Sequence, residues 1–145
     1  MRRAAPLALI GALTLGACST PIPRVGAVSG TYRAEVQDPG GPARPASATV
    51  EENGHGVRIL LTQDGAERTF VGTASLSRAS TLEVNTTRGE AGRCGGSVLP
   101  AEALTLRFEA GGTPVAAGRL FRLTCQDGMP REDYGTASEV RLFRP

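Results

Sequence analysis

The chain has 145 residues, with 16 basic against 14 acidic side chains and a formal net charge of +2. This balance argues against nucleic-acid binding, which needs clustered positive charge. The one histidine, His55, stands beside the turn-forming pair Asn53-Gly54, and we interpret it as an exposed turn residue. With so few candidate ligands and bases, the composition predicts no cofactor, no metal site and no enzymatic activity.

The first 17 residues have the organisation of a secretory signal peptide. Arg2 and Arg3 form a short basic region, and residues 4–15 form an apolar run that is too short to cross a bilayer as a helix. The sequence Leu15-Gly16-Ala17-Cys18 follows at once and resembles the lipobox of bacterial lipoproteins. The resemblance implies cleavage after residue 17 and a diacylglyceryl group on the Cys18 thiol. An ordinary cleaved signal peptide followed by an incidental cysteine is the alternative.

A lipid on Cys18 predicts where the protein resides. Two or three acyl chains hold a protein durably at a membrane, whereas one chain holds it only marginally. Ser19, where an aspartate is associated with the inner membrane in the lipoprotein class, favours the outer membrane, with the protein facing the periplasm. Residues 18–29 then read as a tether, because Pro21 and Pro23 favour an extended chain that spans roughly 30 Å.

From Gly30 onward the apolar residues recur with a period of two, and no segment shows a helical stripe. Tyr32, Ala34 and Val36 share one face of the first strand, and Phe121 and Leu123 share the apolar face of the seventh. We predict an all-β domain over residues 30–145, an eight-stranded antiparallel up-and-down barrel, because closure removes the two exposed edges of a meander. A two-sheet β-sandwich is the alternative. The predicted strands cover residues 30–37, 46–52, 55–63, 67–76, 81–87, 98–109, 115–125 and 138–144.

The connections of such a meander alternate between the two ends of the barrel. Asn53-Gly54 predicts a tight hairpin at the end where the first strand begins and the tether enters. The loops at 38–45, 88–97 and 126–137 fall at the opposite end. We therefore expect tight turns to face the membrane and the long loops to face away from it.

Cys94 and Cys125 are predicted to form a disulfide. With Cys18 assigned to the lipid, these two cysteines remain as a pair in a compartment that permits oxidation. Because the connections of the meander alternate between the two ends, both cysteines are expected at the end of the barrel that carries the long loops. Two free buried thiols are the alternative.

Two of these loops contain candidate partner-binding residues. Arg88 and Arg93 flank a glycine-rich segment next to Cys94 and are suited to present a guanidinium to a carboxylate or phosphate. Arg131, Asp133 and Tyr134 combine mixed charge with an aromatic, as the rim of a protein-contact surface does. The alternative for both loops is a solvated connection without a partner, and Tyr134 is also placed to fold over the barrel mouth.

These features favour a non-enzymatic interaction module that is anchored in the cell envelope and binds an envelope protein through its membrane-distal loops. One alternative is a small-ligand-binding barrel, since Gly30-Thr31-Tyr32 is similar to the Gly-x-Trp motif of lipocalins, with Tyr in place of Trp. The predicted architecture also resembles that of small β-barrel lipoproteins that inhibit lysozyme. That resemblance implies that Arg88 or Arg93 blocks an acidic cleft. A purely structural role is a further alternative.

Overall fold

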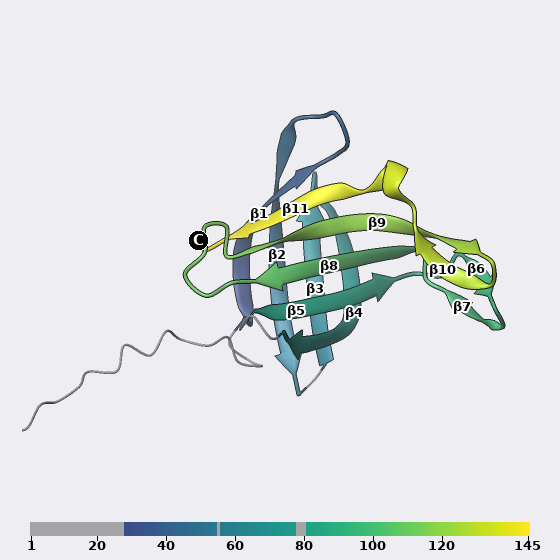
Figure 1. The fold of residues 1–145 in the computed structure, drawn as a ribbon. Helices are drawn as coiled ribbons and strands as arrows, with labels where there is room; N and C mark the ends of the chain where they lie inside the picture. The colour runs from purple at the N-terminus through teal and green to yellow at the C-terminus, as the bar shows by residue number, and fades with distance from the viewer. Residues whose placement is uncertain (1–27, 55, 78–80) are drawn as a thin grey trace, which may run out of the picture.

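A computed structural model describes residues 28–54, 56–77 and 81–145, so Cys18, the predicted signal peptide and His55 lie outside the described residues. The described chain is all-β apart from one 3-10 turn. Eight of its strands build the main body of the protein (Figure 1): β1 (Gly30–Gln37), β2 (Ala43–Asn53), β3 (Gly56–Gln63), β4 (Ala66–Leu76), β5 (Leu82–Arg88), β8 (Glu102–Phe108), β9 (Ala116–Gln126) and β11 (Ser138–Phe143).

These eight strands form a closed antiparallel barrel. Each strand pairs with its neighbours in the order β1-β2-β3-β4-β5-β8-β9-β11, and β11 returns to β1 with Arg33 opposite Phe143 and Gln37 opposite Glu139. The predicted up-and-down barrel is confirmed, and the sandwich alternative is wrong. Closure satisfies the backbone groups of the first and last strands, which would otherwise be exposed edges.

Three short strands and a 3-10 helix lie outside the ring. β6 (Gly92–Cys94) and β7 (Ser97–Leu99) form a hairpin between β5 and β8, and β10 (Met129–Glu132) pairs with the far end of β9. The 3-10 helix η1 (Tyr134–Thr136) leads from β10 into β11. The prediction of one strand over 98–109 was wrong, because Ser97–Leu99 pairs with β6 and the barrel strand begins only at Glu102. Pro100 separates the two strands, and it has no N–H to continue a ladder.

Alternate residues of the eight strands fill the barrel interior. Tyr32, Ala34 and Val36 point inward from β1 as predicted, each at most 4% exposed. Large core side chains such as Ile59 and Phe70 are 0% exposed. If a cavity that could hold a water molecule lay beside them, part of their surface would be accessible to it. The middle of the barrel is therefore packed with side chains.

The predicted orientation of the seventh barrel strand was wrong by one residue. Leu120 lies opposite Leu104 of β8, which points inward, so Phe121 points out of the barrel and Arg122 points toward its interior. Phe121 is nevertheless 8% exposed, because an element outside the ring covers it. Because Leu120 and Phe121 are adjacent and both apolar, the sequence is compatible with either of them pointing inward. Only the pairing with β8 decides which one does.

The two ends of the barrel differ. At one end, which we call the turn end, lie the connections β2–β3, β4–β5 and β8–β9 and the start of β1. Val28, which the sequence placed in the tether, is 6% exposed there. Its carbonyl accepts a 2.6 Å hydrogen bond from the Tyr32 hydroxyl, and its N–H donates to Glu52 Oε1 at 3.0 Å. The turn end is thus closed by the chain that enters it.

The opposite end, which we call the loop end, carries the connections β1–β2, β3–β4, β5–β8 and β9–β11. Two of these connections contain all the extra strands, and they extend to one side of the barrel (Figure 1). The predicted division of turns and long loops between the two ends is confirmed.

Gly72 and Gly118 allow neighbouring strands to approach closely, and this generates a prediction about stability. A Cβ atom at Gly72 would collide with the carbonyl oxygen of Asn85, and one at Gly118 with that of Thr105. We expect Gly72→Ala and Gly118→Ala each to lower the free energy of unfolding by about 1–3 kcal/mol in denaturant titrations, because the strand backbones must shift. Gly41→Ala is the matched control, since its nearest neighbour would lie 3.6 Å away. Equal stability of all three variants would contradict this account of barrel packing.

Candidate functional site

The disulfide joins two hairpins at the loop end. Cys94 of β6 is bonded to Cys125 of β9, with their Cα atoms 5.5 Å apart, so the predicted pairing is confirmed. β9 continues past the barrel and pairs with β10 from Leu123–Glu132 to Gln126–Met129. We call the two hairpins, residues 92–99 and 123–132, the arm (Figure 1).

The arm is packed as well as cross-linked. The turn of the first hairpin meets the turn of the second, where a Cβ on Gly95 would collide with the carbonyl oxygen of Gly128. Cys94 and Leu99 are 4% and 6% exposed, and neither belongs to the barrel core cluster. The N–H of Leu123 also donates to the carbonyl of Ala101 at 3.3 Å. The first hairpin therefore packs against β9 outside the ring.

Exposed apolar side chains gather on and beside the arm. Within the part of the chain that the structure describes, five large hydrophobic residues are exposed. Three of them are Val98 in β7 (51%), Met129 in β10 (58%) and Tyr134 in η1 (74%), and the other two lie on β4. Because the two hairpins are cross-linked, Val98 and Met129 are presented on a rigid support.

The structure separates the two arginines that the sequence grouped together. Arg88 ends β5 and donates to Glu102 Oε2 at 2.6 Å, so it belongs to the barrel mouth. Arg93 lies in the arm, where its guanidinium donates to the carbonyl of Gly96 at 2.6 Å and supports the turn of its own hairpin.

The second predicted group is also divided among different roles. Asp133 caps η1, since its carboxylate accepts from the N–H of Gly135 at 3.1 Å. Tyr134 does not fold over the barrel mouth, because its ring lies 5.9 Å from the guanidinium of Arg119, whose side chain also pairs with Glu132. Arg131 is exposed on β10, and its side chain has no ion pair with any described residue.

A ring of polar side chains, which we call the polar mouth, lines the loop end inside the barrel. Every barrel strand contributes one inward-facing residue near the point where it reaches the loop end of the ring. Sequence analysis did not identify this ring, although each member continues the inward alternation of its strand. The eight residues are Asp38, Arg44, Gln63, Arg68, Arg88, Glu102, Arg122 and Ser138.

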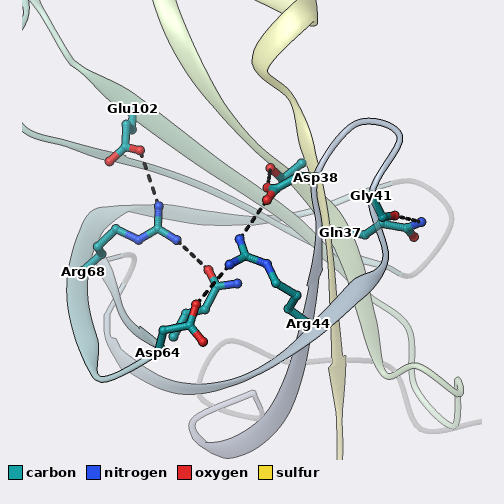
Figure 2. Close-up of polar contacts among 9 residues, drawn as sticks. Gln37, Asp38, Gly41, Arg44, Asp64, Arg68 and Glu102 are labelled. Atoms are coloured by element: carbon teal, nitrogen blue, oxygen red, sulfur yellow. Dashed lines mark hydrogen bonds and ion pairs between the residues drawn. The ribbon is translucent and has the colours of Figure 1, made fainter.

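One side of the polar mouth is built around Arg44 (Figure 2). Its guanidinium contacts Asp38 Oδ2 at 2.8 Å and Asp64 Oδ2 at 3.0 Å. The Ser138 hydroxyl donates to the other oxygen of Asp38 at 2.6 Å. The hydrogen bond from Ser138 and the nearby Arg44 charge hold the pKa of Asp38 below its ordinary value, so this carboxylate is ionised at neutral pH.

The other side is built around Glu102. Arg68 Nη1 lies 3.5 Å from Oε1 of this carboxylate, and Arg88 Nη1 lies 2.6 Å from Oε2. Arg68 also donates to Gln63 Oε1 at 3.3 Å. The side chains of Arg68 and Glu102 are only 24% and 22% exposed, so this pair is better shielded from water than most surface ion pairs.

No known protein family matches the chain, and no curated protein matches it. The described residues contain no helix capable of crossing a membrane. Across the same residues, no three His, Cys, Asp or Glu side chains converge in a way that would hold a metal ion. The geometry of the loop end therefore carries the functional argument.

Loss of the disulfide is expected to loosen the arm. In the double variant Cys94→Ser/Cys125→Ser, the cross-link over 31 residues is removed, which costs up to about 3.5–4 kcal/mol of unfolding free energy in the chain-entropy description. Hydrogen exchange should become faster in β6, β7 and β10, and remain slow in β2 and β3. Unchanged protection of the arm would show that packing alone holds it in place. Reduction of the unmodified protein should reproduce the effect of the double variant.

Proposed function

We propose that the protein is a lipid-anchored component of a bacterial envelope that acts as a non-enzymatic interaction module and binds a protein partner through the arm. The observation that carries the proposal is the position of the arm. It stands at the loop end, opposite the turn end where the chain enters the barrel at Val28.

The difference between the two ends of the barrel determines which end lies nearer the proposed anchor. A lipid on Cys18 precedes Val28 by ten residues, so the anchored chain joins the barrel at the turn end. The arm then projects away from the anchored side. In the proposed location, at the outer membrane and facing the periplasm, the arm meets other envelope proteins.

The chemistry of the arm supports a protein partner. Met and Tyr are enriched at protein interfaces, where apolar contact area is combined with polar contacts at the rim. Met129, Val98 and the exposed Tyr134 supply that area, and the unpaired Arg131 supplies a rim charge. A cross-linked support lowers the entropy cost of binding, because less of the surface has to be ordered when the partner arrives.

The packed interior favours this proposal over a carrier that holds its ligand inside the barrel. Core residues at the middle of the barrel are 0% exposed, so an internal ligand would have to displace them. The only histidine, His55, lies outside the described residues, and the described carboxylates of the polar mouth are held in ion pairs with arginines.

The anchor is tested by fractionation and mass analysis. We expect the mature protein to begin at Cys18, to carry the mass of a lipid on that residue, and to sediment with membranes. Cys18→Ala should leave the precursor uncleaved and without the lipid mass, because the lipid is added to the thiol. A mature chain with an unmodified Cys18 would contradict the proposed anchor. Ser19→Ala is the matched control and should be processed normally.

The arm is tested by crosslinking in intact envelopes. We expect Val98→Asp/Met129→Asp to abolish capture of the partner, because two charges would replace the apolar contact area. Val71→Asp is the matched control, since Val71 is similarly exposed at 59% but lies on the barrel wall in β4. Near-ultraviolet circular dichroism checks that each variant is folded. The same set of crosslinked proteins from all three samples would contradict a role for the arm.

A further inference from the structure

We propose that the polar mouth is a binding site for the anionic group of a small molecule, a carboxylate or a phosphate, with Arg122 as the principal contact. This site lies inside the barrel rim, whereas the exposed apolar residues of the arm lie outside it. The inference therefore does not depend on the proposed role of the arm.

The polar mouth surrounds an open cavity of a suitable size. A cavity of about 540 Å³ opens there, within the range typical of small-molecule sites. Val36 and Leu120 lie at the bottom of this cavity and are only 1% and 5% exposed, so most of its accessible lining is polar. Asp38, Arg68 and Arg122 are among the polar side chains around it. A small polar molecule with a charged end matches this lining.

The acidic groups of the mouth are already engaged. Both oxygens of Asp38 accept hydrogen bonds, one from Ser138 and one from Arg44. Both oxygens of Glu102 face arginines, Arg68 on one side and Arg88 on the other. Asp64 has one oxygen on Arg44. Few acceptor sites therefore remain for the other donors of the mouth.

Some hydrogen-bond donors of the mouth, in contrast, have no acceptor among the described residues. Arg122 lines the cavity directly opposite Glu102 in the β8–β9 register, yet its guanidinium has no hydrogen bond or ion pair with any described residue. The Nε2 atom of Gln63 is buried and has no acceptor among the described residues, while its Oε1 accepts from Arg68. A buried donor without a partner is unfavourable, so an acceptor-rich ligand would stabilise the site.

The charges are also divided between two walls. One wall carries a net charge of +2, from Arg68 on β4, Arg88 on β5, Glu102 on β8 and Arg122 on β9. The opposite wall holds Arg44 with Asp38 and Asp64, for a net charge of −1. An anion is therefore attracted to the wall that contains Arg122. The planar fork of a guanidinium binds a carboxylate or a phosphate through two parallel hydrogen bonds.

The test is a nuclear magnetic resonance titration of the folded domain, residues 28–145, which contains the whole closed barrel. The probes are N-acetylglycine, which carries a carboxylate, inorganic phosphate, and the neutral N-acetylglycinamide, at constant ionic strength. We expect a saturable shift of the Arg122 Nε–H and Gln63 side-chain amide signals with at least one anion and none with the neutral amide. The anion with the tighter saturation identifies the ligand class.

Arg122→Gln should weaken this binding about tenfold or more, because a charge-assisted pair of hydrogen bonds is lost. Arg131→Gln is the matched control, since Arg131 is also exposed at the loop end without an ion pair, and it should change the affinity less than twofold. The amide spectrum of each variant shows whether the barrel is intact. Failure of both anions to saturate the unmodified protein would overturn the inference, as would equal loss in the two variants. Val98→Asp/Met129→Asp should leave anion binding unchanged, so failure of this site and failure of the arm are separable.

Discussion

The pairing of β11 with β1 is the constraint on which the rest of the structure depends. Because this pairing closes the sheet, every strand has two neighbours and a fixed inward face. The inward positions then form layers along one axis: Val28 and Tyr32 at the turn end, a packed apolar middle, and the polar mouth at the loop end. A slip of one residue in a strand would turn its outward side chains, such as Glu35 of β1 or Arg119 of β9, toward the core and would expose its apolar ones.

Closure also determines where the protein can carry extra structure. In an eight-stranded meander the connections alternate between the ends, so the two long insertions, between β5 and β8 and between β9 and β11, lie at the same end. They are the two segments that the Cys94–Cys125 bond connects. Cys125 points outward from β9, as Phe121 does, so the disulfide lies on the outer surface. The mouth is left open beside it.

The loop end thus combines two kinds of surface at one pole. The arm offers exposed apolar area on a cross-linked support, and the mouth offers guanidinium groups around an open cavity. Their physical separation follows from the alternation of β9, where Phe121 points out of the barrel and Arg122 points toward the mouth. Neighbouring residues on one strand consequently serve two different surfaces.

Much of the fold was determined by the sequence alone. Period-two patterns such as Tyr32, Ala34 and Val36 specify strands, and Asn53-Gly54 specifies a tight turn, because these preferences depend on local chemistry. The pairing of Cys94 with Cys125 was also predicted, because these two cysteines remain when Cys18 is assigned to the lipid and because strand parity brings both to one end. Only the tertiary structure decided the rest. The register between β8 and β9 determines that Leu120 rather than Phe121 points inward, and the short ladder with β6 removes Ser97–Leu99 from the barrel. The polar mouth depends on the same long-range information, since its eight residues are spread over a hundred positions and converge only when the ring closes.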